Sequence, residues 1–101
     1  MKVDSDKISL QSQLVEILKP ACITNCKSRD WCSATFHGYQ LRYDMILKGS
    51  GRKACADGLS DILTDHDFAL DRHFVADIGV EDRSDHDTHI SMAVTLLLIA
   101  D

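Results

Sequence analysis

The most regular pattern of apolar and polar positions in this chain lies between Phe74 and Ala100. Apolar residues alternate with polar or small ones from Phe74 to Glu81, and again from Ile90 onwards. A period of two is typical of β-strands that bury one face. The sequence therefore predicts a C-terminal β-hairpin over about 73–100.

The polar segment 81–87 separates the two arms, and its composition predicts the reversal of the chain. If Asp82 lies opposite Thr88, then Val80 faces Ile90, and apolar residues of one arm meet apolar residues of the other throughout. A slip by one residue would turn a whole apolar face to water, so we expect this register.

The end of the second arm is apolar on both faces, from Leu96 to Ala100. Such a run is typical of an interior strand, or of a strand whose second face is covered by a partner. Leu97 and Ile99 fall on the face that this partner would cover.

The rest of the chain alternates between helical and extended patterns. Apolar residues at helical spacing predict helices over about 5–19 and 51–63, and a period of two predicts a long strand over about 34–48. In 21–37, Cys22–Thr24 could form a short strand and Lys27–Asp30 is typical of a turn. The expected fold is a single α+β domain over 1–101, with an antiparallel sheet of three to four strands, two helices packed on one face, and a C-terminal β-hairpin.

Within the helical patterns, two buried stripes are expected. They consist of Leu10, Leu14, Ile17 and Leu18 in the first helix and of Cys55, Leu59, Ile62 and Leu63 in the second, with Ser50 as the cap of the second helix.

Composition and charge exclude several classes of protein. The chain has 101 residues, is 45% hydrophobic and carries a net charge of −5. An acidic chain without a Lys/Arg cluster is not expected to recognise nucleic-acid sequence. No apolar run is long enough to span a membrane, and no signal peptide is expected. Four cysteines in such a chain are most simply reduced thiols of a cytoplasmic protein, although two disulfides or a zinc site remain alternatives.

Candidate chemistry is concentrated in the polar segment near the hairpin turn. Asp85, Asp87 and His89 would share one side of a strand, and carboxylates and imidazoles are common metal ligands. The simpler interpretation is a solvated loop, because a short polar loop offers little to hold ligands in place. No cofactor and no enzymatic activity are expected. Trp31, the only tryptophan, either closes one end of the core or anchors a contact between proteins.

The order of these features resembles the small tail-terminator, or head-to-tail joining, proteins of tailed phages and gene transfer agents. The resemblance covers roughly residues 30–101. It rests on Trp31, the His37-Gly38-Tyr39 start of the long strand, the Gly51-Arg52 start of a helix, the Phe68–Leu70 piece, the Asp82-Arg83-Ser84-Asp85 loop and the hydrophobic last strand. The segment before Trp31, residues 20–30, is shorter than is usual in that family.

The resemblance implies a structural subunit that forms a homo-oligomeric ring at the end of a tail tube, with a hexamer as the favoured size. Its partners would be copies of itself, tail-tube proteins and head-connector proteins. It would be found in the cytoplasm or in an assembled phage-like particle. The family contributes no catalytic residues. Trp31, Leu97 and Ile99 are the expected interface residues. The alternative is a small metal-binding protein or metal-dependent enzyme that uses residues 85–89.

Overall fold

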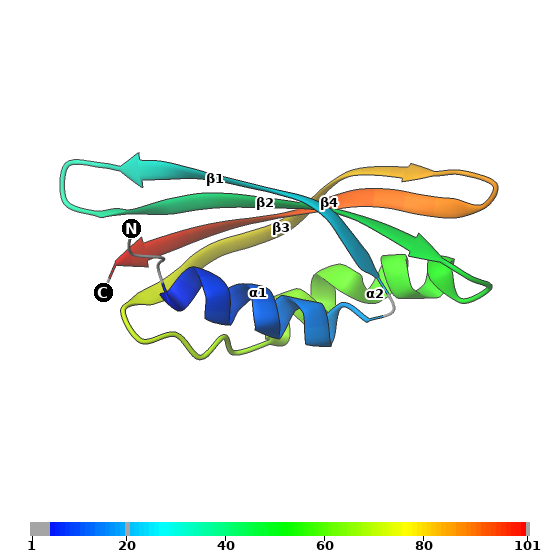
Figure 1. Ribbon diagram of the computed structural model, residues 1–101, viewed down its shortest axis with the longest axis horizontal. Helices are drawn as coiled ribbons and strands as arrows, with labels where there is room; N and C mark the ends of the chain where they lie inside the picture. Colours follow the sequence, from blue (N-terminus) through cyan, green and yellow to red (C-terminus); the bar gives the residue numbers. More distant parts are fainter. Residues whose placement is uncertain (1–4, 20, 101) are drawn as a thin grey trace.

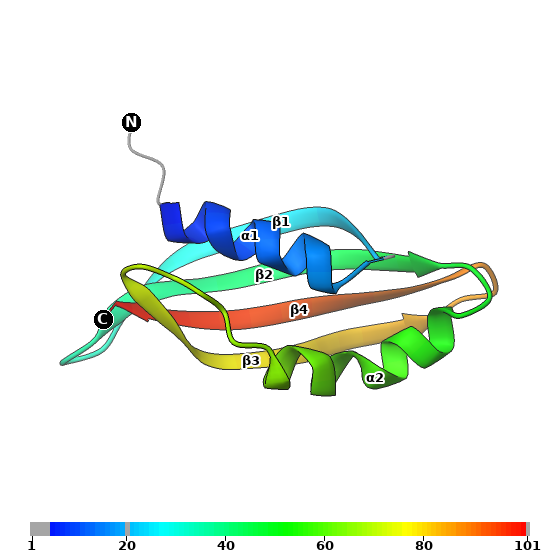
Figure 2. The ribbon, with the colours of Figure 1, turned by 90° about the horizontal axis from the view of Figure 1, so that it is seen from below.

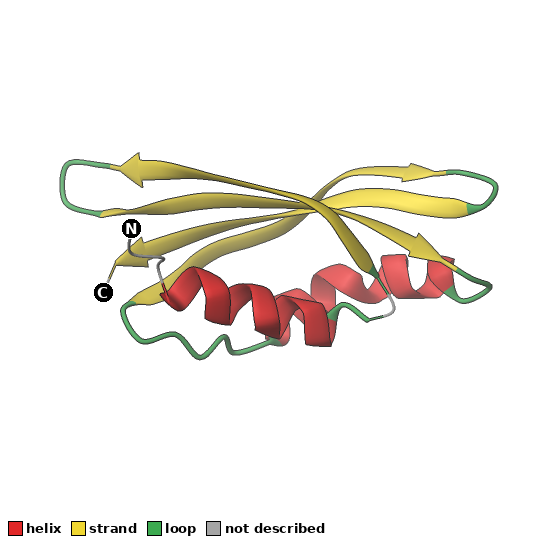
Figure 3. Cartoon of the chain, in the orientation of Figure 1, coloured by secondary structure: helices red, strands yellow, loops and turns green. Residues whose placement is uncertain are grey.

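The computed structural model describes residues 5–19 and 21–100. These residues form two helices and one four-stranded sheet, and every pair of neighbouring strands is antiparallel. The elements are α1 (Ser5–Ile17), β1 (Cys22–Cys32), β2 (His37–Lys48), α2 (Arg52–Asp65), β3 (His73–Asp85) and β4 (His89–Ala100). The strand order is β1-β2-β4-β3, and both helices lie on the same face of the sheet (Figures 1 and 3). The expected α+β class with a C-terminal hairpin is confirmed.

The core lies between the helices and the sheet. Seen from the helix side in Figure 2, α1 lies across β1 and β2, and α2 lies along β3. The two central strands and both helices contribute its buried side chains, which include Leu10, Leu14, Leu41, Tyr43, Met45, Leu59, Leu63, Met92, Val94, Leu96 and Leu98. The alternation in β2 and β4 therefore marks the strands correctly, because one face of each packs against the helices.

Two polar side chains of α1 fasten the segment that follows α2. The Asp6 carboxylate is 2% exposed and accepts hydrogen bonds from the backbone N–H groups of Asp71 (3.0 Å) and Arg72 (2.8 Å). Nδ1 of His73 lies 2.7 Å from Oδ2 of Asp6. This nitrogen carries the hydrogen of the bond, because an ionised carboxylate can only accept. Further along α1, the Gln13 amide bonds both the N–H and the carbonyl of Ala69. These bonds hold residues 69–73 against the helix.

The first strand corrects the prediction for residues 21–37. β1 extends over eleven residues, so the turn expected at Lys27–Asp30 lies in the middle of a strand. The reversal occurs instead at 33–36, where the Ser33 N–H bonds the Phe36 carbonyl and the Ser33 hydroxyl accepts from the Phe36 N–H. Nearly all of β1 is exposed on both faces, so its residues carry no alternation that could have predicted a strand.

The C-terminal hairpin is longer and more irregular than predicted. β3 continues to Asp85, and the reversal is confined to 86–88, so the loop expected over 81–87 is wrong. Val80 pairs with Val94 rather than Ile90, a shift of four positions that keeps the apolar faces together. Bulges between Val75 and Asp77 and between Glu81 and Ser84 absorb the extra residues, and Asp82 takes a positive φ of 54°.

The second helix differs in its cap and in one buried position. Its N-cap is Gly51, without a side-chain hydrogen bond, so Ser50 is not the cap that the sequence suggested. Ala56, Leu59 and Leu63 are buried, whereas Ile62 is 49% exposed. The buried stripe is therefore narrower than expected.

Candidate functional site: the uncovered face of the sheet

The face of the sheet away from the helices has no covering element in the described part of the chain (Figure 1). We call it the open face. Strand pairing brings its residues into rows that cross all four strands in the order β1, β2, β4, β3. The rows are Trp31, Gly38, Ile99 and Phe74; Arg29, Gln40, Leu97 and Asp77; Lys27, Arg42, Thr95 and Gly79; and Asn25, Asp44, Ala93 and Glu81.

The first row, together with Leu97 of the second, forms an apolar end of the open face. The structure brings together the three expected interface residues, because Trp31 and Ile99 share the first row and Leu97 occupies the second. Trp31 and Leu97 are half-buried, Ile99 is 9% exposed and Phe74 is 45% exposed. We call Trp31, Phe74, Leu97 and Ile99 the apolar end.

Phe74 is the member of the apolar end that the sequence did not reveal. The alternation in β3 placed it with Ile78 and Val80, on the face toward the core. The bulge between Val75 and Asp77 reverses the phase, so that Val75 packs against the core and Phe74 turns outward. A bulge of this kind leaves no mark in the pattern of apolar residues.

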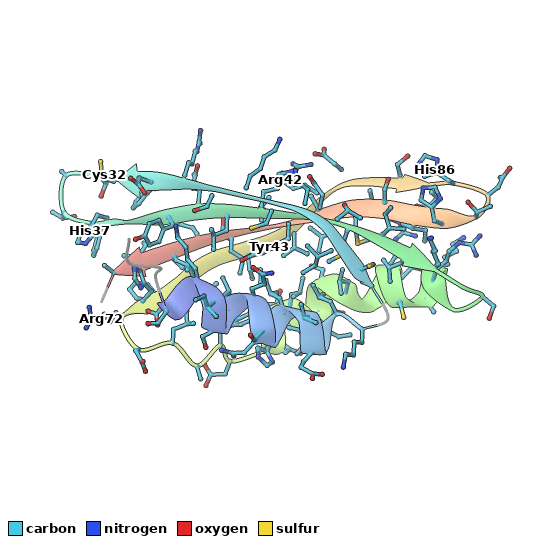
Figure 4. The ribbon with its side chains drawn as sticks, viewed as in Figure 1. Cys32, His37, Arg42, Tyr43, Arg72 and His86 are labelled. Atoms are coloured by element: carbon cyan, nitrogen blue, oxygen red, sulfur yellow. The ribbon has the colours of Figure 1, made fainter. Side chains whose placement is uncertain are left out.

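Polar and charged groups occupy the rest of the open face, and Arg42 is at their centre. Its guanidinium bonds Asp44 on its own strand (3.0 Å) and reaches across β4 to Asp82 of β3 (2.8 Å). The Arg42 side chain crosses β4 at a point where the side chains of β4 are small. Ala93, next to this crossing on β4, is fully buried. Figure 4 shows Arg42 above the sheet and Tyr43 between the sheet and the helices.

Electrostatic effects follow from these contacts. The hydrogen bonds that Arg42 donates to Asp82 and then to Asp44 raise the pKa of Arg42 above its usual value. On the other side of the sheet, burial raises the pKa of the Tyr43 phenol, and the adjacent Cys26 thiol adds to the effect. Both groups therefore keep their protons at neutral pH, and neither acts as a base.

A hollow of about 940 Å³ opens among these residues. Its lining carries basic groups from β1 and β2 and acidic groups from β3, among them Lys27, Arg29, Arg42, Asp77 and Glu81. Basic and acidic side chains thus lie at opposite sides of the same surface. This arrangement suits contact with another protein surface of mixed charge.

The candidate metal ligands lie at the other end of the molecule, near the β3–β4 turn. Asp85 is bonded through both carboxylate oxygens to Arg83, at 2.8 and 3.1 Å, and this arginine lowers the pKa of Asp85. The His86 and His89 rings stack at 4.5 Å, and the Asp87 carbonyl accepts from Arg52. In residues 5–19 and 21–100, no three His, Cys, Asp or Glu side chains gather as a metal-binding group, so Asp85, Asp87 and His89 do not form one.

No helix in the described residues has the length and apolar character needed to cross a membrane.

Comparison with protein-family models, with curated proteins and with solved structures finds no match to this chain. The case for a function therefore rests on the open face and on the residues that form it.

Proposed function

We propose that this chain is a structural subunit that assembles with copies of itself into a ring at the end of a phage-like tail. The observation that carries the proposal is the apolar end of the open face. Ile99 pairs with Phe74, Leu97 lies in the next row on the same strand as Ile99, and Trp31 lies across Gly38 from Ile99, all on a surface that the described chain does not cover. Apolar side chains that gather on an uncovered face, with Phe74 exposed and Trp31 and Leu97 half-buried, mark a contact site between proteins.

A second copy is the occupant that the surface fits best. The open face carries basic groups toward β1, namely Lys27 and Arg29, and acidic groups toward β3, namely Asp77 and Glu81. A surface with positive charge on one side and negative charge on the other is complementary to the same surface of a second copy, when that copy is displaced so that unlike charges meet. Contacts between two different patches of the same chain produce rings or filaments, as the resemblance to tail-terminator proteins implies.

A charge at Leu97 is expected to prevent assembly while leaving the subunit folded. Leu97 is only half-buried and points away from the helices, so Leu97→Asp puts a carboxylate into the apolar end rather than into the core. We expect the apparent dissociation constant of the assembly to rise at least about a hundredfold, as a desolvated, unpaired charge costs several kcal/mol. Sedimentation velocity measures the association, and circular dichroism the folding.

Ser91→Asp is the matched control, because Ser91 lies on the same strand and the same face but away from the apolar end. It should assemble like the unmodified protein. If Leu97→Asp and Ser91→Asp assemble equally well, the apolar end is not part of the interface. Electron microscopy of the unmodified assembly tests the architecture: the proposal predicts particles with a central hole, and compact particles without one would contradict a ring.

A further inference from the structure

The sheet ends on both sides in an outer strand whose outer backbone edge pairs with no other strand of the described chain. These strands are β1 and β3. Each is long, with eleven and thirteen residues. Such edges present free N–H and carbonyl groups at the spacing of a strand and can accept a further strand. The regular parts of the two edges are Asn25–Cys32 in β1 and Asp77–Glu81 in β3, since bulges interrupt the pairing outside them.

The directions of the strands favour a joint between unlike edges. Each strand is antiparallel to its neighbour, so β1 and β3, the first and last of four, are antiparallel to each other. When a second copy is placed beside the first in the same orientation, its β1 meets β3 of the first copy in antiparallel fashion. The combined sheet then continues the pattern found within each copy.

The charges of the two edges are opposite in sign. β1 carries two basic residues, Lys27 and Arg29, and one acid. β3 carries four acids and a single arginine. Two β1 edges would bring like charges together, as would two β3 edges, and like charges on paired strands destabilise the pairing. Only the unlike joint brings the mainly basic edge against the mainly acidic one.

One register of the joint pairs opposite charges and at the same time extends the apolar end into the next copy. Within a copy, Arg29 and Asp77 share a row, and Trp31 and Phe74 share the next. If the rows continue into a neighbouring copy, its Arg29 lies opposite Asp77 and its Trp31 falls beside the exposed Phe74. An ion pair and an aromatic pair then form on the same face of one joint.

We infer that the Asp77–Glu81 edge of one copy pairs with the Asn25–Cys32 edge of the next, as one continuous antiparallel sheet. The inference rests on the proposed self-assembly and adds a contact at the sheet edges to the contact through the open face. Every copy uses two different edges, so assembly continues until the ring closes. The apolar end of each copy becomes continuous with that of its neighbour.

Charge reversal on the two edges tests the joint. Lys27→Glu/Arg29→Glu reverses two charges of β1, and Asp77→Lys/Glu81→Lys reverses two charges of β3; all four side chains lie on the open face as well as on an edge strand. Each variant alone should lose association at least about a hundredfold, because both produce like charges across the joint. An equimolar mixture of the two should reassemble, since every joint in an alternating ring again has opposite charges. The fourfold variant in one chain should reassemble for the same reason.

Two controls carry equal changes of charge at positions outside the strands. Lys19→Glu/Lys53→Glu matches the first variant and Asp61→Lys/Asp65→Lys the second, and all four positions are exposed on or next to helices. Both controls should assemble normally. If an edge variant fails to fold by circular dichroism, Arg29→Glu and Asp77→Arg provide the same test with one change on each edge.

The outcomes separate this inference from the proposed function. Assembly of both edge variants at unmodified strength overturns the edge joint but leaves self-association standing. The edge joint is also overturned if both edge variants lose assembly and neither the mixture nor the fourfold variant recovers it. A loss confined to the β1 variant overturns it as well, because that result would indicate a joint between two β1 edges. Failure of the unmodified protein to associate at all overturns the proposed function itself.

Discussion

Replacing Gly38 with alanine is expected to lower the free energy of unfolding by about 3 kcal/mol. Gly38 pairs with Ile99 of β4, and a Cβ at this position would overlap the carbonyl oxygen of Leu98 in the backbone of that strand. The obstacle is main chain in the middle of the sheet, so it cannot move aside as a flexible side chain would. The two central strands must separate locally. Urea denaturation followed by circular dichroism measures the change.

Gly79→Ala is the matched control, because Gly79 is also a strand glycine on the open face. Its added Cβ would lie 3.8 Å from Oγ1 of Thr95, an ordinary contact. Stability should therefore stay the same or rise by up to about 1 kcal/mol, as glycine within a strand is entropically unfavourable. Equal effects of the two substitutions would show that the close approach of β2 and β4 at Gly38 is not a constraint.

Asp6→Asn is expected to lower the free energy of unfolding by about 2–3 kcal/mol at neutral pH. The substitution removes the negative charge from the buried acceptor of three hydrogen bonds and changes part of their geometry. Burial alone would raise the pKa of Asp6. The hydrogen bonds from His73 and from the backbone of Asp71 and Arg72 outweigh it, so the pKa lies below the ordinary 3.8. The carboxylate is thus bound more favourably in the folded chain than in the unfolded one.

The same shift predicts how the effect depends on pH. A lowered pKa in the folded state means that the unfolded chain binds the proton more readily, so the stabilisation is fully present above 3.8. It is lost as the pH falls through the lower pKa of the folded state. The stability difference between the unmodified protein and Asp6→Asn should therefore shrink toward zero at strongly acidic pH. Denaturation at a series of pH values measures it.

Asp61→Asn serves as the control, because Asp61 is exposed on α2. It should change stability little at any pH. A difference for Asp6→Asn that stays constant across the acidic range would contradict the role given to the charge of Asp6.

The parts of the fold that sequence could predict are those that bury one face against the helices. β2 and β4 alternate clearly because Leu41, Met45, Met92 and Leu96 pack into the core while their neighbours face the open side. The helical stripe of α1 is evident for the same reason, with Leu10 and Leu14 fully buried. In each case one face of the element is covered and the other is not, which is the condition for a periodic pattern.

The remaining features escaped prediction for physical reasons. β1 is exposed on both faces, so Lys27 to Asp30 resembles a polar turn. The hairpin register depends on bulges at Ala76 and at Asp82–Arg83, which change the pairing without changing the composition. The bonds of Asp6 join groups more than sixty residues apart, and no local pattern signals them. The expected interface residues Trp31, Leu97 and Ile99 could be named from the sequence, but their common surface follows from the strand order.

The most direct test of self-assembly is the native mass of the purified protein, measured by light scattering behind a sizing column over a range of concentrations. The subunit has a mass of 11.3 kDa. Assembly through the open face and the sheet edges predicts a discrete species at a whole multiple of that mass, with six as the multiple that the resemblance favours. A mass of 11.3 kDa that does not change up to about 1 mM, where an interface worth only about 4 kcal/mol would already be half formed, would contradict the account.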